Sequence, residues 1–328
     1  MFSGTRISYE KTLQIAKVNP YRNYMKSSAG VAAGHERAYH AGFPDIRVKP
    51  KFKLLKSDRV FTIGSCFARN IEIYLAKAGM DCISLRHTFP GPYYDLGGQD
   101  RNGALNAFTP NSMLDVIRLG DRDDRETAGV VQVGDDDYVD MMLWGLRSLN
   151  GAELASARAT LLRAYGEASQ ADVHVITLGL TESWFDTKDS IYVNRSPGSS
   201  IKTARRGERF EFHNLTPQQT FAKVDEVIQA LRGLGKKQSR IIVTVSPVPL
   251  ASTFTDRDVV SANAYSKSTL LGAAVAVADN YDFVDYMPSY ELVTMSRRED
   301  AWEEDGAHVK SALVGRVVDF FSRNYFED

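Results

Sequence analysis

Short apolar runs alternate with longer amphipathic segments along most of the chain. The runs are rich in β-branched residues and predict buried strands. The segments between them repeat their apolar positions with a helical period. The predicted strands lie at 59–63 (RVFTI), 82–85 (CISL), 172–180 (DVHVITLGL), 240–250 (RIIVTVSPVPL) and 281–286 (YDFVDY). The predicted helices lie at about 66–78, 110–119, 151–169, 217–234, 261–280 and 306–326. This alternation predicts a parallel sheet covered by helices on both faces.

Three stretches interrupt the alternation. Residues 1–56 lack clear periodicity and predict an N-terminal wrap or lid with short helical pieces. Residues 121–140 are acidic and irregular, and residues 189–213 have the polar pattern of a β-hairpin insertion. We therefore expect one α/β domain over 57–328, elaborated at its N-terminus and in mid-chain.

Composition excludes several classes of protein. The chain has 328 residues, 43% of them hydrophobic, and its 40 basic and 41 acidic residues leave a formal net charge of −1. No basic arm is present, so a nucleic-acid partner is not expected. The first 20 residues lack the apolar stretch of a signal peptide, and no window approaches the ~20 apolar residues of a membrane span. We expect a cytoplasmic protein with no membrane span; its oligomeric state does not follow from the sequence.

The chain has only two cysteines, Cys66 and Cys82, which is too few for a disulfide framework. No CxxC metal motif is present, and neither a metal nor a tightly bound cofactor is expected. Cys82 lies inside a predicted strand and is interpreted as a core residue. Cys66 instead follows the strand at 59–63 through Gly64 and Ser65, where a helix begins.

Ligands of such sheets bind at the carboxyl ends of the strands. At that position Cys66 would meet the unpaired N–H groups and the dipole of a helix N-terminus, which favour a nucleophilic thiolate. The alternative is a small buried side chain, as most free cysteines are. From these residues alone, Ser65 is the other candidate nucleophile.

Asp305 and His308 lie before the last predicted helix, three residues apart. This spacing places both side chains on one side of a helical turn, where the carboxylate would orient the imidazole. An N-capping aspartate followed by a surface histidine explains the same pattern.

The sequence Gly179-Leu180-Thr181-Glu182 follows the third predicted strand. Gly179 permits close backbone approach, Thr181 is a hydroxyl donor and Glu182 a group that could bind or orient a substrate. The alternative is that Thr181 caps a following helix.

Together these segments resemble the GSCFA family, which is named for the string at Gly64–Ala68. The likeness extends over about residues 59–320. It includes TLGLTESW (177–184), SPVPL (246–250), ANAYSKSTL (262–270), VDYMPSYE (284–291) and DGAHV (305–309). The family looks like a distant branch of the SGNH (GDSL) hydrolases, which implies a three-layer α/β/α, flavodoxin-like fold with a parallel sheet of about five strands.

The resemblance also implies roles for individual residues. Gly64-Ser65-Cys66 matches the superfamily's Gly-Asp-Ser block, so Cys66 takes the nucleophile position and Ser65 becomes a turn or capping residue. Asp305 and His308 match the DxxH block that supplies the acid and base.

The superfamily's oxyanion hole uses the N–H of the nucleophile, a glycine N–H and an asparagine side chain. Backbone N–H groups near Gly64 and Gly179 match the first two. Thr181 stands at the place of the asparagine, and Asn106 is a second candidate for that donor.

These residues predict an acyl-transfer enzyme, either an O-acyltransferase or an acyl esterase, that works through a Cys66 thioester. The expected substrate is a bacterial glycan or another hydroxyl-bearing small molecule, with an acyl-coenzyme A as donor co-substrate. Tyr93, Tyr94 and Trp184 are candidates for stacking on sugars. The alternative is a glycan- or nucleotide-binding protein on the same scaffold without catalysis. A phosphatase of the Cys-x5-Arg type is disfavoured, since it needs an arginine where the chain has Glu72.

Overall fold

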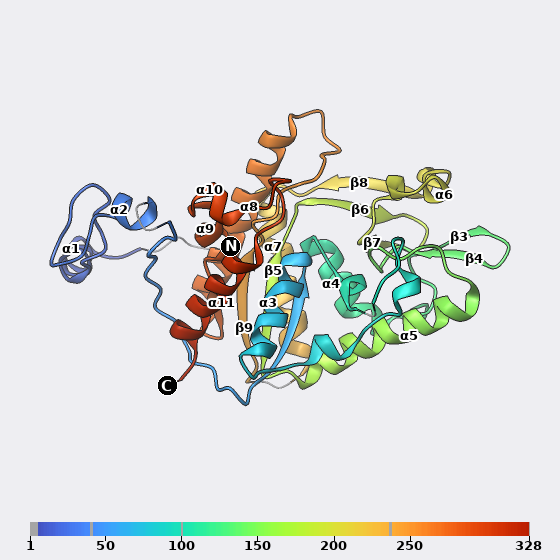
Figure 1. Cartoon of the computed structure of the whole chain (residues 1–328), viewed down its shortest axis with the longest axis horizontal. Helices are drawn as coiled ribbons and strands as arrows, with labels where there is room; N and C mark the ends of the chain where they lie inside the picture. Colours follow the sequence, from blue (N-terminus) through green and yellow to red (C-terminus); the bar gives the residue numbers. More distant parts are fainter. Residues whose placement is uncertain (1–5, 40–41, 100, 236–237, 328) are drawn as a thin grey trace.

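The computed structural model describes residues 6–39, 42–99, 101–235 and 238–327. Its centre is a five-stranded sheet in the order β2-β1-β5-β9-β10, and all four neighbouring pairs are parallel (Figure 1). The strands are β1 Arg59–Gly64, β2 Asp81–Cys82, β5 Val173–Leu178, β9 Arg240–Val245 and β10 Val284–Tyr286. The predicted α/β class and the sheet of about five parallel strands are confirmed.

Helices cover both faces of this sheet. Alternate side chains of β1 point to opposite faces, so that Phe61 joins one hydrophobic cluster and Val60 the other. One face is covered by α4 Pro110–Arg118, α5 Gly151–Glu167, α7 Pro217–Leu234 and α8 Val259–Asn280. The other is covered by α3 Cys66–Lys77, α9 Ser289–Thr294, α10 Arg298–Ala301 and α11 Ser311–Tyr325. The result is a three-layer α/β/α arrangement.

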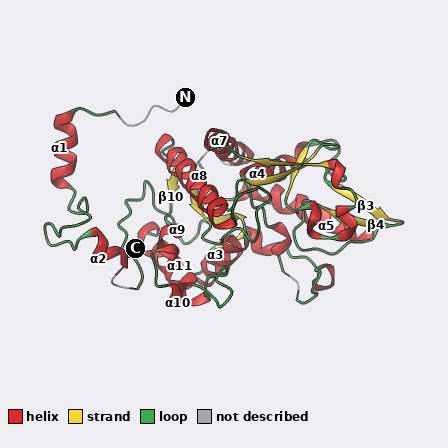
Figure 2. Cartoon of the chain, turned by 90° about the horizontal axis from the view of Figure 1, so that it is seen from above, coloured by secondary structure: helices red, strands yellow, loops and turns green. Residues whose placement is uncertain are grey.

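The N-terminal segment has two parts. The helices α1 Tyr9–Val18 and α2 Gly34–Tyr39 project from the body and have no buried residue (Figures 1 and 2). From Phe43 to Phe52, apolar side chains pack on the α11 side, and Leu54 pairs with Phe326. Residues 1–5 and 40–41 of the predicted segment lie outside the described residues.

The mid-chain elaborations lie at the end of the molecule opposite α1 and α2 (Figures 1 and 2). Residues 121–140, expected to be irregular, contain a hairpin of β3 Val130–Gly134 and β4 Asp137–Asp140 that buries Val131 and Val139. Residues 189–213 do not form the predicted hairpin. Their strands β7 Ile191–Val193 and β8 Phe210–Asn214 both pair with β6 Glu182–Asp186, and the helix α6 Ile201–Ala204 lies between them.

Other local predictions were wrong for identifiable reasons. The predicted strand at 82–85 ends at Cys82, because the Ser84 carbonyl accepts from the Asn102 side chain instead of a strand. The alternative interpretation, in which Thr181 caps a following helix, is wrong, because the strand β6 follows and its first residue pairs with Asn214. The last helix begins at Ser311, because Asp305 holds the residues before it in a turn.

The strand order indicates where a ligand would bind to this sheet. Counted along the chain, the sheet reads 2-1-3-4-5, so the connections leave β1 and β5 in opposite directions. A crevice forms at such a switch point, outside the carboxyl ends of the two strands. Ser65 and Cys66 follow β1, and Gly179 follows β5. Two of the sequence motifs therefore meet at the crevice.

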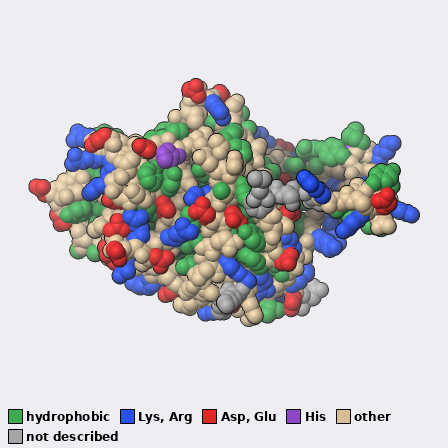
Figure 3. All heavy atoms as spheres, turned by 180° about the vertical axis from the view of Figure 1, so that it is seen from behind, with side chains coloured by type: hydrophobic (Ala, Val, Ile, Leu, Met, Phe, Trp, Pro, Cys, Tyr) green, Lys and Arg blue, Asp and Glu red, His purple; other side chains and the backbone are tan. Residues whose placement is uncertain are grey.

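The surface opposite the view of Figure 1 carries acidic and basic side chains interspersed with one another (Figure 3). Large apolar side chains are exposed on the N-terminal arm, and Tyr9 is 73% and Val18 78% accessible. Within the described residues, no helix is long and apolar enough to cross a membrane.

Candidate active site

The turn from β1 into α3 holds Cys66 in a fixed place. A Cβ on Gly64 would lie 2.6 Å from the Thr177 carbonyl oxygen, so the neighbouring strand excludes any side chain there. Ser65 caps α3, because its hydroxyl oxygen accepts from the Phe67 N–H at 3.4 Å. The same hydroxyl donates to Ser246 Oγ, 3.2 Å away at the end of β9. This use of the Ser65 hydroxyl fits the predicted capping role.

Cys66 is the first residue of α3 and is partly exposed, in contrast to the buried residues on either side of it. Burial raises the pKa of its thiol. Hydrogen bonds from the Phe67 and Cys66 N–H groups, the charge of Lys267 and a contact with Ser65 act in the opposite direction. The sulfur thus lies in an apolar place that several donors make more favourable for a thiolate.

Cys66 opens into a pocket of about 530 Å³. Seven chain segments form its walls: those at the ends of β1, β5, β7 and β9, the one before α4, the one around Trp144 and the turn before α11. The surface that faces the pocket is mostly apolar, although about half of the side chains that line it are polar. Among the lining residues are Cys66, Asn106, Phe108, Trp144, Gly179, Glu182, Trp184, Arg195, Ser246, Phe254 and His308.

His308 brings an imidazole to the same pocket. Asp305 Oδ1 accepts from the backbone N–H of Ala307 and of His308, both at 2.9 Å, and its Oδ2 lies 2.5 Å from His308 Nδ1. These bonds lower the pKa of the Asp305 carboxyl to about 2, with the His308 side chain the largest cause. The predicted Asp305–His308 pair is therefore formed, in a turn rather than in a helix. The His308 side chain is 66% accessible and lies at the mouth of the pocket.

The predicted oxyanion donors are placed unequally. The N–H groups of Gly179 and Leu180 both donate to the Phe108 carbonyl, at 3.1 and 2.9 Å. Gly64 is buried and does not line the pocket. Thr181 is also buried away from it, with its hydroxyl donating to Asn214 Oδ1 at 2.9 Å. The structure thus does not bring the donors expected from Gly179, Gly64 and Thr181 to the thiol.

Asn106 is the candidate donor that the structure does bring there. It lies before α4, lines the pocket with Cys66 and is only 2% accessible. Its side-chain Oδ1 is buried without a hydrogen-bond partner. This oxygen is an acceptor, so its unused capacity points to a missing hydrogen-bond donor in the pocket, whereas an oxyanion would need the Nδ2 group of the same amide.

Glu182 lines the pocket, but its carboxylate is already engaged. Thr253 Oγ1 donates to Oε1 at 2.6 Å, and the Phe254 N–H donates to Oε2 at 2.9 Å. Glu182 thereby fixes the loop after β9, which carries Phe254 against Trp184 with ring centroids 5.0 Å apart. Glu182 therefore affects the pocket indirectly, by holding the loop that forms part of its wall.

The aromatic walls were only partly predicted. Trp184 lines the pocket as expected, and Trp144 and Phe108 form a second aromatic pair with centroids 5.8 Å apart. Tyr94 is instead a core residue, whose hydroxyl donates to the Arg101 carbonyl and accepts from the Ala104 N–H. Tyr93 packs against the same core and is not among the pocket residues.

Lys267 of α8 is the residue that sequence reasoning missed. It is 1% accessible, and its Nζ donates to the Gly179 carbonyl at 2.8 Å. A signal for it was present in the sequence, because it is the only Lys or Arg between residues 259 and 280. A lone basic residue in a mostly small and apolar helix is a candidate for a buried, functional charge.

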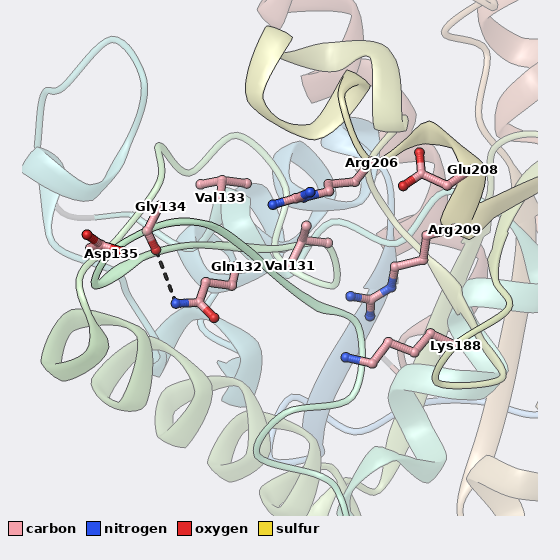
Figure 4. Close-up of a pocket in the computed structure, with 9 residues that line it drawn as sticks. All are labelled: Val131, Gln132, Val133, Gly134, Asp135, Lys188, Arg206, Glu208 and Arg209. Carbon is pink, nitrogen blue, oxygen red and sulfur yellow. Dashed lines mark hydrogen bonds between the residues drawn. The ribbon is translucent and has the colours of Figure 1, made fainter.

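A second pocket, of about 480 Å³, lies between the β3–β4 hairpin and the segment around α6 (Figure 4). Arg209 on its wall pairs with Asp186 and Asp189. Lys188, Arg206, Glu208 and Asp135 also line it. This pocket is lined by no cysteine, serine or histidine, so the thiol pocket is the better candidate for nucleophilic chemistry. Within the described chain, no group of three His, Cys, Asp or Glu side chains is placed to hold a metal ion.

The fold and the pocket together define an α/β/α protein with a thiol at the switch point of its parallel sheet and a carboxylate-bound imidazole at the mouth. The chain belongs to the GSCFA family, whose model matches residues 59–321. No curated protein matches the sequence.

Proposed function

We propose that this protein is an acyl-transfer enzyme, an O-acyltransferase or acyl esterase, with Cys66 as its nucleophile. One observation carries the proposal: Cys66, at a helix N-terminus, and His308, held by Asp305, line the same pocket. The relation to SGNH hydrolases, inferred from the Gly64-Ser65-Cys66 and Asp305/His308 blocks, supports the same roles.

The reaction starts with proton transfer from the Cys66 thiol to His308 Nε2, while Asp305 holds Nδ1. The sulfur attacks the acyl carbonyl and forms a tetrahedral intermediate. We assign its oxyanion to the Cys66 N–H and the Asn106 Nδ2 group, because both residues line the pocket. The bond to the leaving group then breaks, His308 returns the proton to that group, and an acyl-cysteine remains.

A second nucleophile completes the cycle. A hydroxyl group or water gives its proton to His308 and attacks the thioester, and the thiolate leaves and regains the proton. The thioester is close in free energy to an acyl-coenzyme A, so transfer from such a donor is nearly balanced. The aromatic walls fit a sugar face or an apolar acyl chain. We propose a glycan or polysaccharide precursor as the acceptor and an acyl-coenzyme A as co-substrate.

Mass spectrometry of trapped adducts tests the proposal. The protein is incubated with acetyl- and octanoyl-coenzyme A and with activated acyl esters, quenched in acid and mapped by peptide. The expected adduct lies on Cys66, is present in Cys82→Ala and Ser65→Ala, and is absent from Cys66→Ala. An adduct that persists in Cys66→Ala would refute the thiol mechanism. Added sugars then distinguish transfer from hydrolysis.

A second candidate function is non-catalytic binding of a glycan or nucleotide. The occupied N–H groups of Gly179 and Leu180 favour it, since they remove two expected oxyanion donors. This candidate predicts saturable binding of a sugar or nucleotide in the pocket, equal affinity in Cys66→Ala, and no adduct with any acyl donor.

A further inference from the structure

Asn194 and Arg195 form a fixed part of the wall of the thiol pocket. They follow β7, and their backbone N–H groups both donate to the Met141 carbonyl, at 2.9 and 3.2 Å. The Asn194 side chain adds a third bond, from Nδ2 to the Met142 carbonyl at 3.0 Å. The two residues are only 9% and 7% accessible. Hydrogen bonds to residues 141–142 therefore set the position of this part of the wall.

The amide of Asn194 has an unused acceptor. Its Nδ2 donates to the Met142 carbonyl, which fixes the orientation of the amide, and its Oδ1 is buried without a hydrogen-bond partner. Oδ1 of Asn106 is in the same state. Within the described residues, these are the two side-chain amide oxygens that are buried without a partner, and both residues line the thiol pocket. An amide oxygen only accepts, so a ligand that satisfies it must bring hydroxyl or N–H donors.

The guanidinium of Arg195, the next residue, has unused donors. Among the described residues, the side-chain hydrogen bond of Arg195 goes to the Leu146 carbonyl and leaves further N–H groups over. Its ion-pair partner, Asp95, lies 3.9 Å from Nη2 and has a side chain that is 57% accessible, so that pair is weak. A planar guanidinium with free N–H groups matches a carboxylate or a phosphate, to which it donates two parallel hydrogen bonds.

The other charged side chains that line the pocket are already engaged. The Glu182 carboxylate accepts two hydrogen bonds from the loop after β9, and the His308 imidazole is bound to Asp305. Arg195 is the remaining cation among the lining residues. The negative charge of a ligand in this pocket would therefore have Arg195 as its partner.

The segment that anchors Asn194 also supplies an aromatic face. Trp144 lies two residues after Met142, lines the pocket and is 44% accessible. Aromatic walls with a few fixed polar groups bind a ligand by its apolar face and orient it by its polar edge. Trp144, Asn194 and Arg195 thus offer a face, an acceptor and a cationic donor on one side of the pocket.

We propose that Asn194 and Arg195 form the subsite for the acyl acceptor, and that this acceptor is an acidic sugar, a polyhydroxylated ring that carries a carboxylate or a phosphate. Arg195 binds the anionic group, a ring hydroxyl donates to Asn194 Oδ1, and Trp144 packs on the face of the ring. The inference rests on the proposed function and deepens it, since it names the class of the acceptor and the residues that select it.

Calorimetric titration of Cys66→Ala tests binding apart from chemistry, because this variant cannot form the acyl-cysteine. The ligands are glucose, galactose and mannose, the uronic acid of each, and the 6-phosphate of each, so that the carboxylate and phosphate arms are compared directly. At least one acidic sugar is expected to bind about tenfold or more tightly than its neutral parent. In the same background, Arg195→Gln should abolish this preference and Arg195→Lys should retain part of it. Asn194→Ala should weaken binding of the acidic and the neutral sugar alike, by about three- to tenfold.

Two variants make matched changes outside the thiol pocket. Arg206→Gln removes a cation from the second pocket (Figure 4). Asn102→Ala removes a buried asparagine whose Nδ2 also donates to a backbone carbonyl, that of Ser84. Both variants should leave the affinities unchanged.

Binding of no acidic sugar, or equal affinity for acidic and neutral sugars, would overturn the proposal. So would loss of the preference in Arg206→Gln rather than in Arg195→Gln. If Arg195→Gln does not fold, the comparison of acidic with neutral sugars and the effect of Asn194→Ala decide. Arg195-dependent binding with no acyl adduct on Cys66 would refute the proposed enzyme and leave the subsite intact, and an adduct without any preference for acidic sugars would do the reverse.

Discussion

The two cysteines of this chain occupy opposite environments within one α/β unit. Cys66 begins α3 and faces the pocket, where N–H groups and Lys267 favour its thiolate. Cys82 ends β2 and donates its S–H to the Glu72 carbonyl, with a donor–acceptor distance of 3.4 Å. Burial and the charges of Glu72 and Asp81 raise the pKa of Cys82 to about 12. The groups directed at each sulfur, rather than burial alone, therefore distinguish the two thiols.

Glu72 is the charged group that contributes most to the raised pKa of Cys82. Its buried carboxylate accepts from Thr62, Ser84 and Asn102 and pairs with Arg69, so it stays in place as a fixed charge. The sequence position that would carry the arginine of a phosphatase loop thus holds a structural carboxylate. The proposed nucleophile therefore lies at the N-terminus of α3, and a buried structural carboxylate lies in the middle of the same helix.

The largest expected effect is on the rate of acyl transfer, after removal of the imidazole that assists Cys66 but not Cys82. His308→Ala is expected to lower the rate of acyl transfer by about 10²–10⁴-fold, because general base catalysis at Cys66 is lost. The measurement is kcat with an activated ester. His213→Ala is the matched control, since His213 also has a carboxylate partner, Glu211, but does not line the pocket. Equal rates for both variants would contradict the role of His308.

Asn106→Ala tests the donor that the structure places beside Cys66. The expected loss is about 10²–10³-fold in kcat with little change in KM, since an oxyanion donor acts on the transition state. Thr181→Ala should leave kcat nearly unchanged, because its hydroxyl bonds to Asn214 away from the pocket. The reverse ranking would restore Thr181 as the donor.

Alkylation of the wild-type protein compares the thiols directly. At pH 8 iodoacetamide should label Cys66 faster than Cys82, since a thiol with a pKa of about 12 is almost wholly protonated there. Peptide mapping over time gives both rates in one sample. Labelling of Cys82 should rise only above about pH 11 in the folded protein. Comparable labelling at pH 8 would remove the contrast.

The buried amine predicts how stability depends on pH. The pKa of Lys267 is lowered to about 7 in the folded protein, so above pH 7 the unfolded chain binds more protons than the folded one. The contribution of Lys267 should therefore make the free energy of unfolding rise, by about 1–2 kcal/mol between pH 7 and 8.5. Urea titrations should find this rise in the wild type and a flatter profile in Lys267→Met. The same profile for both would contradict a depressed lysine pKa.

The smallest expected effect concerns the serine that precedes Cys66. Ser65→Ala removes the α3 cap and should cost about 1 kcal/mol in the free energy of unfolding while Cys66 still forms its adduct. Asn150→Ala removes the cap of α5, far along the chain from the thiol, and is the matched control for stability. Loss of the adduct in Ser65→Ala but not in Asn150→Ala would show that Ser65 takes part in the reaction.

The sequence predicted the central sheet well, because its strands are short apolar runs whose periodicity differs from that of the helices. It also predicted that Cys66 and His308 lie near the same edge, since both flank elements of a parallel sheet. It could not predict which donors reach the thiol. Gly179 and Thr181 follow the expected strand, yet their hydrogen bonds go to Phe108 and Asn214, which are distant in sequence. Such pairings depend on tertiary packing.

The elaborations were predicted least accurately for a related reason. Residues 189–213 have the composition of a polar hairpin, but β6, outside that range, supplies the strand to which β7 and β8 pair. Pairing partners of short, polar strands are set by what lies nearby in the fold. Lys267 was missed because a helical pattern of small residues reads as core, and its charge was not treated as an exception.

Residues Val193–Ser196, at the end of β7 and before α6, form part of the pocket wall. The thiol and the imidazole, in contrast, come from the sheet and its flanking helices. In the proposed enzyme, reaction and selection therefore reside on separate parts of the chain, and the strands of the selecting insertion pair with β6 rather than with each other. A lineage that remodels this insertion can change what enters the pocket without disturbing the residues that react with it.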